Sequence, residues 1–106
     1  MNARIKQLWI DALRSGEYEQ TINLFRLKPI DGSKICYCAT GVLMNLYEKE
    51  VGEIKNWNTV PLELIEWAEL PLIAEIKHGD LGDIIELNDE KQKSFAEIAD
   101  FIEEFF

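Results

Sequence analysis

A β-hairpin is predicted by residues 20–38, QTINLFRLKPIDGSKICYC. Two runs rich in β-branched and aromatic residues, 20–27 and 34–38, flank a turn that contains Asp31 and Gly32. An Asp-Gly pair between two such runs is a common hairpin signal, and its position here predicts a loop longer than a two-residue turn. Because a two-stranded ribbon is marginally stable by itself, the pattern also requires a helix that packs against one face.

The residues before the hairpin predict that helix. Apolar side chains recur with helical spacing at Ile5, Leu8, Trp9, Ala12 and Leu13. Gly16 follows this stripe and suits the left-handed conformation that ends many helices. We therefore expect an N-terminal helix that covers the ribbon.

The residues after the hairpin predict three further helices. Thr40 is suited to cap the first of these, and Pro61 fits the first turn of a short helix over 62–70. Ser94 and Glu97 have the spacing of a capping box, in which each side chain satisfies a free backbone N–H at the start of a helix. The capping box predicts that the last helix begins directly after Ser94.

A third strand is predicted at residues 84–87, Ile-Ile-Glu-Leu, where it would extend the hairpin. The resulting order of elements predicts an α+β fold in which about four helices pack on a small antiparallel sheet. We expect one domain over residues 1–106, since no linker or repeat divides the chain.

The composition is typical of a soluble protein. Hydrophobic residues make up 47% of the chain, which argues against disorder. The first residues lack the apolar core of a secretory signal, and the apolar stretch around 70–74 is far too short to span a bilayer. We expect a cytoplasmic protein.

The chain offers few groups for metal binding. Cys36 and Cys38 are too close in sequence for an unstrained structural disulfide, and we expect two buried free thiols. His78 is the third soft ligand, and a carboxylate would have to complete a zinc site. The turn carboxylates, Asp80, Asp83, Asp89 and Glu90, do not follow the spacing of a calcium-binding loop. We predict no metal and no cofactor.

No catalytic residue is predicted either. Nucleophilic catalysis needs a nucleophile, a base and a group that orients the base, and the single histidine, His78, lies in a His-Gly-Asp turn. The sequence also lacks a glycine-rich phosphate loop. An enzyme of unknown type is therefore the least favoured of three hypotheses.

The leading hypothesis rests on an uneven distribution of charge. Residues 1–50 carry seven Lys/Arg and six Asp/Glu, whereas residues 51–106 carry four Lys and fourteen Asp/Glu. Such a field favours a protein partner with a basic surface and disfavours nucleic acid or an anionic membrane. The predicted partner-binding residues are acidic: Glu63, Glu66, Asp80, Asp83, Asp100, Glu103 and Glu104.

The alternative hypothesis is a small-molecule binding protein that sequesters a nucleotide signal. Cationic side chains would bind the phosphates, and an aromatic ring would stack on the base. The predicted ligand-binding residues are Arg14, Arg26, Lys28, Lys34, Tyr37 and Trp57. Trp57 lies between Asn56 and Asn58, and the favoured interpretation of this residue is a lid that folds back over the core.

Three patches of sequence together resemble a family of small phage, prophage and bacterial proteins of uncharacterised function. They are W-x-x-A-L-R-S-G-x-Y-x-Q from Trp9, Y-C-x-x-G-V-L from Tyr37, and L-N-D from Leu87 followed by S-F-x-x-I-A from Ser94. The resemblance implies a phage or prophage origin, a bacterial host cell and no known reaction. In that setting the acidic half is expected to inhibit a host nucleic-acid-binding or defence protein.

The chain departs from the family pattern at two places. It has Cys38-Ala39-Thr40-Gly41 where the family often has Cys-Cys-Leu-Gly, and Thr21-Ile22-Asn23 where a glycine-rich stretch is common. The first departure argues against a role for adjacent thiols. The terminal aromatic pair, Phe105 and Phe106, also leaves self-association into a homo-oligomer open.

Overall fold

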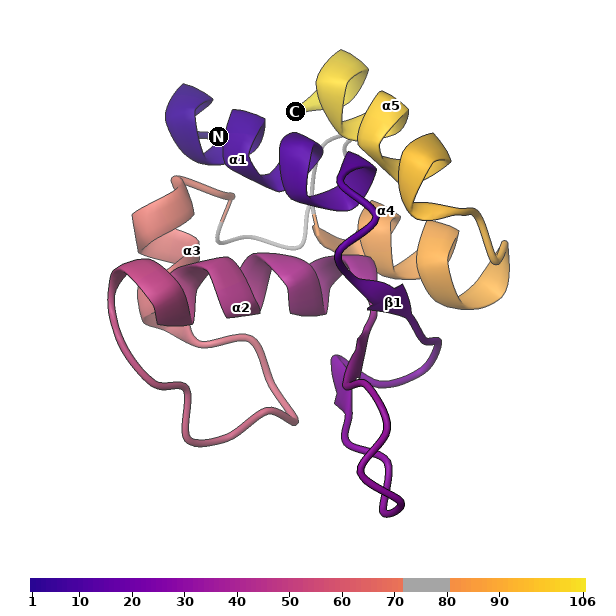
Figure 1. Cartoon of the computed structure of the whole chain (residues 1–106). Coiled ribbons are helices and arrows are strands. Elements are labelled where there is room, and N and C mark those ends of the chain that lie inside the picture. Colours follow the sequence, from indigo (N-terminus) through magenta and orange to yellow (C-terminus); the bar gives the residue numbers. More distant parts are fainter. Residues whose placement is uncertain (72–80) are drawn as a thin grey trace.

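The computed structural model describes residues 1–71 and 81–106, and it confirms the predicted α+β class (Figure 1). The first half of the chain forms α1 (Ala3–Arg14), β1 (Glu19–Gln20), β2 (Arg26–Leu27), β3 (Cys36–Tyr37) and α2 (Ala39–Glu50). The second half forms α3 (Leu62–Ala68), α4 (Leu81–Ile85), the π-helical turn η1 (Glu86–Glu90) and α5 (Phe95–Phe105).

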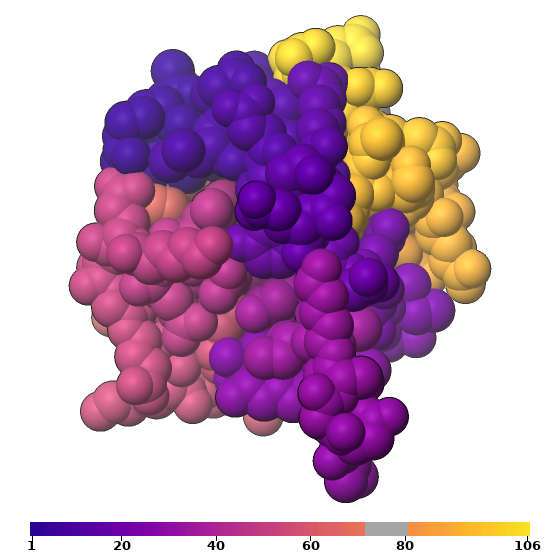
Figure 2. Space-filling model, viewed as in Figure 1, coloured from indigo at the N-terminus to yellow at the C-terminus, as the bar shows by residue number. Residues whose placement is uncertain are grey.

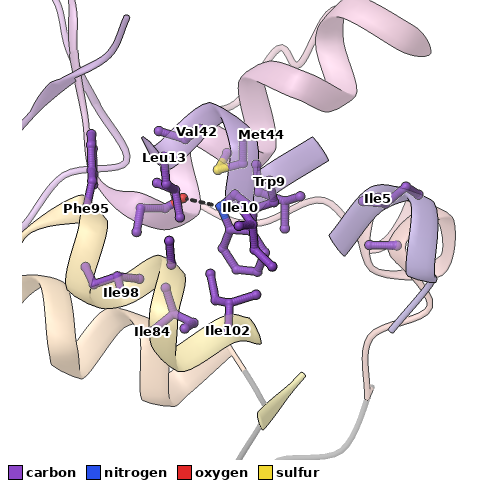
Figure 3. Close-up of a cluster of buried hydrophobic side chains, with 14 of the residues drawn as sticks. Ile5, Trp9, Ile10, Leu13, Val42, Met44, Ile84, Phe95, Ile98 and Ile102 are labelled. Atoms are coloured by element: carbon purple, nitrogen blue, oxygen red, sulfur yellow. Dashed lines mark hydrogen bonds between the residues drawn. The ribbon is translucent and has the colours of Figure 1, made fainter. Parts of the chain in front are cut away.

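The hydrophobic core lies where α1 and α5 pack together over α2 and α4 (Figure 1). Figure 3 shows side chains from these four helices converging around Trp9, which is fully buried. The Trp9 indole Nε1 donates a hydrogen bond of 2.9 Å to the Ala39 carbonyl, so burial leaves no unsatisfied donor on this side chain. The bond also fixes α1 to the start of α2.

The predicted hairpin is confirmed, but the predicted third strand is wrong. β2 and β3 pair antiparallel, with Arg26 opposite Tyr37. The third strand is β1, which pairs parallel with β3 on its other edge, so the sheet is mixed and has the order β1-β3-β2. Residues 84–87 are helical, because buried Ile84 and Asn88 are four residues apart and bring one helical face to the core.

Two predicted helix starts also need correction. Cys38, not Thr40, caps α2: its Sγ accepts a hydrogen bond from the Gly41 N–H at 3.3 Å. Thr40 lies inside the first turn, where its buried Oγ1 has no hydrogen-bond partner among the described residues. Pro61 is the residue before α3 rather than part of it, and α3 ends at Ala68, where Glu69 takes a left-handed conformation.

The other helix ends agree with the sequence. Gly16 follows α1 with a φ of 77°, as predicted for the end of that helix. Ser94 Oγ accepts from the Glu97 N–H, and the Glu97 carboxylate accepts from the Ser94 N–H, each at 3.2 Å. The capping box is therefore formed by the predicted pair.

Gly41 is where α2 touches the ribbon. A Cβ atom built on Gly41 would lie 1.8 Å from the Phe25 carbonyl oxygen, so only glycine fits at this position. The same carbonyl accepts a hydrogen bond of 3.3 Å from the Cys38 N–H. The first turn of α2 therefore rests directly on the backbone that leads into β2. Beyond this contact the hairpin projects away from the helices (Figures 1 and 2).

The close approach at Gly41 predicts the effect of two matched substitutions. Gly41→Ala should lower the free energy of unfolding by about 3 kcal/mol or more, because the backbone of β2 must move. Gly52→Ala meets no atom within 4 Å and should change it by less than about 0.5 kcal/mol. Urea denaturation followed by circular dichroism measures both values. Equal effects of the two substitutions would contradict the packing described for α2.

Candidate ligand-binding surface

Three aromatic side chains from separate segments form a continuous row. Tyr18 follows α1, Tyr37 belongs to β3, and Trp57 comes from the loop between α2 and α3. The ring centroids of Tyr18 and Tyr37 are 5.3 Å apart, and those of Tyr37 and Trp57 are 6.1 Å apart. These distances are typical of aromatic pairs, so the rings support one another. We call Tyr18, Tyr37 and Trp57 the aromatic row.

Cations lie against both ends of the aromatic row. The Arg26 guanidinium carbon is 4.0 Å from the centroid of the Trp57 ring. At the other end the Lys49 ammonium is 5.5 Å from the Tyr18 ring and donates a hydrogen bond of 3.3 Å to the Tyr18 hydroxyl. Cations this close to an aromatic face are attracted by its quadrupole. Burial raises the pKa of Tyr37, so this phenol is neutral at pH 7.

A cavity of about 310 Å³ opens beside Tyr18 and Tyr37. Its lining includes Lys34 and Lys49, and also Glu17 and Asn45, of which Asn45 accepts a hydrogen bond of 2.7 Å from the Tyr18 hydroxyl. We call it the lysine cavity. Aromatic rings next to ammonium groups can stack on a flat ligand and neutralise an anionic group attached to it.

Four of the six predicted ligand-binding residues meet at this surface: Arg26, Lys34, Tyr37 and Trp57. Arg14 does not, because it lies at the end of α1 and pairs with Asp100 and Glu103 on α5 at 2.7 and 3.2 Å. These carboxylates raise the pKa of Arg14. Lys28 is exposed on the hairpin and does not line the lysine cavity.

Two residues of the surface were not among the predicted ones. Tyr18 carries a signal in the sequence, since it belongs to the Tyr-x-Gln patch after the first helix. Lys49 lies one helical turn after Asn45 on α2, so both face the lysine cavity. The sequence alone provides no reason to place Lys49 at a binding surface, because its helical spacing from Asn45 is informative only when Asn45 is known to line a cavity.

The position of Trp57 confirms that this residue folds back over the core as a lid. Trp57 also lines a second cavity. Its ring packs against the hydrophobic core, and its buried Nε1 has no hydrogen-bond partner within the described part of the chain. The second cavity, about 270 Å³, has an apolar wall of Trp57, Leu24, Phe25 and Ile85. Its polar lining is Asn23, Cys38, Asn58 and Asp89. We call it the Asp89 cavity.

Asp89 is held in place by two hydrogen bonds. Its Oδ1 accepts from the Asn23 backbone N–H at 2.9 Å and from Asn88 Nδ2 at 2.8 Å. Asn23 has a φ of 66°, a left-handed conformation that asparagine tolerates better than most residues. The carboxylate therefore joins η1 to the chain between β1 and β2.

Asn88 is fully buried and uses both ends of its amide. Its Oδ1 accepts from the Ala39 N–H at 3.0 Å and from Gln20 Nε2 at 2.9 Å. Its Nδ2 donates to the Thr21 carbonyl at 2.9 Å as well as to Asp89. This one side chain links η1 to β1 and to the first turn of α2.

The cysteines are free, as predicted, but only Cys38 is buried, while Cys36 is half-buried. Burial raises the pKa of Cys38 to about 11, so the thiol is neutral at pH 7 and is a weak nucleophile. No group of three or more His, Cys, Asp or Glu side chains suited to a metal ion occurs among residues 1–71 and 81–106. His78 and Asp80 lie outside the described residues.

The acidic residues predicted to bind a partner are divided among helices. Glu63 and Glu66 are exposed on α3, whereas Asp100, Glu103 and Glu104 are exposed on α5. Figure 1 shows α3 at one end of α2 and α4, which carries the predicted Asp83, at the other end. The acidic helices therefore do not form one continuous face.

The chain belongs to a family described as a domain of unknown function, DUF8296, whose model matches residues 1–64. No curated protein and no solved structure matches the chain. The matched residues include the whole aromatic row and the cations beside it, whereas α4, η1 and α5 lie outside them. The resemblance to phage and prophage proteins stays a prediction. No helix in the described part of the chain is long and apolar enough to cross a membrane.

The hydrogen bonds of Asn88 predict a strong effect of its removal. Asn88→Ala should lower the free energy of unfolding by about 3 kcal/mol or more, because the buried Ala39 N–H and the part-buried Thr21 carbonyl lose their partners. Asn58→Ala removes an exposed amide from the same cavity region and should cost less than about 0.5 kcal/mol. Thermal unfolding by differential scanning calorimetry compares the two. If Asn88→Ala lowers the free energy of unfolding by no more than Asn58→Ala does, the hydrogen bonds of Asn88 do not stabilise the fold.

Proposed function

We propose that the protein binds a small anionic ligand with an aromatic ring, of the nucleotide class, without transforming it. The observation that supports this proposal is the meeting of Trp57, Tyr37 and Arg26 with two lysines at one surface. These side chains come from β2, from β3 and the turn before it, from α2 and from the loop after α2. Stacking from aromatic rings and charge-assisted hydrogen bonds from cations are the two interactions that a nucleotide requires.

Local charge favours an anion at this surface even though the whole chain carries −9. Arg26 lies over the Trp57 ring, and Lys34 and Lys49 line the lysine cavity together with Glu17. Exposed charges farther than about 10 Å are largely screened at 0.1 M salt, so the cations at the row act on a ligand more strongly than distant carboxylates do. A protein that binds a nucleotide signal in this way would sequester it and lower its free concentration.

The proposal predicts nucleotide binding that depends on the cations of the row. Titration with a panel of nucleotides should change the fluorescence of Trp57, and Arg26→Gln or Lys49→Gln should weaken binding by about tenfold, as expected for the loss of one charge-assisted contact. Isothermal titration calorimetry gives the dissociation constants. Trp57→Phe assigns the signal, because Trp9 is buried and Trp67 packs against Tyr47.

Arg14→Gln is the matched control. It removes one positive charge from a surface ion pair with α5 and should leave the affinity unchanged within about twofold. A loss of affinity equal to that of Arg26→Gln would mean that net charge alone governs binding. The absence of binding across the panel would refute the proposed function.

A second candidate function is binding of a basic protein, which in the predicted phage setting would be a host nucleic-acid-binding or defence protein. Its support is charge: residues 81–106 carry eight Asp/Glu and two Lys, and Lys91 and Lys93 already pair with Glu86 and Glu97. Glu104 remains exposed on α5 beside the Arg14 ion pair. This surface is smaller than the sequence suggests, because Arg14 neutralises part of it.

The second candidate predicts a complex that dissociates as salt rises, since screening shortens to about 3 Å at 1 M. Native mass spectrometry of the protein purified gently from bacterial cells detects such a complex. Glu104→Gln should weaken it, and Glu17→Gln, which removes an exposed acid near β1, should not. A complex that is insensitive to both salt and the acidic substitutions would contradict an electrostatic interface.

A further inference from the structure

The two cavities lie on either side of one aromatic pair. Trp57 lines the Asp89 cavity, Tyr37 lines the lysine cavity, and their ring centroids are 6.1 Å apart. Arg26 lies over the Trp57 ring and pairs with Tyr37 across the ribbon. A ligand that places its ring in one cavity can therefore reach the cations beside the other with a short extension.

The Asp89 cavity is suited to a flat ring with hydrogen-bond donors on one edge. Trp57, Phe25 and Ile85 supply apolar surface for the ring faces. The carboxylate of Asp89 supplies acceptors, and both of its hydrogen bonds within residues 1–71 and 81–106 end on Oδ1. Its Oδ2 is then the acceptor available to a ligand. The carboxylate is held by a backbone N–H and a buried amide, so it is oriented before the ligand arrives.

Guanine and adenine differ in the hydrogen-bonding groups that they would present to the Asp89 carboxylate. Guanine presents an N1–H and an amino group side by side, and the available carboxylate oxygen, Oδ2, can accept from both because it has two lone pairs. Adenine presents an acceptor nitrogen at the equivalent position, which a carboxylate repels. We propose that the Asp89 cavity binds the base of the nucleotide and selects guanine through Asp89. This inference rests on the proposed function, in which Arg26, Lys34 and Lys49 bind the phosphates.

The inference is tested by a series of nucleotides that differ only in the base. The wild-type protein should bind GTP about tenfold more tightly than ATP, as expected for hydrogen bonds to a charged acceptor. ITP keeps the N1–H but lacks the amino group and should fall between them. XTP has a carbonyl in place of that amino group, faces the carboxylate with an acceptor and should bind more weakly than ITP. Calorimetry with the intact chain measures all four.

Asp89→Asn is the decisive variant. An asparagine retains an oxygen for the Asn23 N–H and Asn88 Nδ2, so the fold should persist, which thermal unfolding checks. The amide can donate to a carbonyl, so the variant should lose its preference for GTP over ATP and gain affinity for XTP. Arg26→Gln should instead lower the affinities for GTP and ATP by the same factor, because Arg26 binds the phosphates that both nucleotides share.

The outcomes separate the two proposals. Equal affinity of the wild-type protein for GTP and ATP, or a guanine preference that survives Asp89→Asn, overturns the assignment of Asp89 and leaves the proposed function standing. The absence of binding by every nucleotide overturns both. If Asp89→Asn does not fold, the order GTP, ITP, XTP with the wild-type protein decides the question, and any other order overturns the assignment.

Discussion

The buried amide of Asn88 is the constraint on which the arrangement of the other elements depends. It joins η1 to Gln20 and Thr21 on one side and to the Ala39 N–H on the other. Since α2 begins at Ala39 and the ribbon begins with β1, their relative position follows from this side chain. Gly41 completes the contact by letting α2 approach the Phe25 backbone. Two members of the aromatic row, Tyr18 and Tyr37, lie within two residues of the residues that this network joins.

Patterns among neighbouring residues in the sequence correctly predicted the elements that depend on local interactions. The hairpin, the first helix with Gly16 behind it and the Ser94–Glu97 capping box each depend on residues close in sequence, and each is confirmed. The parallel pairing of β1 with β3 depends on residues 17 positions apart, which no local pattern encodes. Residues 84–87 have strand-like side chains, but their burial in the helical core outweighs that propensity.

The candidate site was predicted by residue type more than by position. A tryptophan flanked by amides and a set of basic residues in the first half indicated Trp57, Tyr37, Arg26 and Lys34, and the structure brings these together. Arg14 has the same chemistry, but its place at the end of α1 commits it to α5. The proposed role of Asp89 was hidden because the sequence places it in a turn, whereas its backbone partner, Asn23, lies 66 positions away.

If the proposed function holds, the contact between Arg26 and Trp57 affects which aromatic molecules bind at the surface. In the unliganded protein a guanidinium already occupies one face of the indole at 4.0 Å. An uncharged aromatic compound that stacks on that face must displace Arg26 and offers it nothing in return. A compound carrying a negative group gives the displaced guanidinium a new partner. Under the proposed function, Arg26 therefore favours aromatic ligands that carry a negative group over neutral ones.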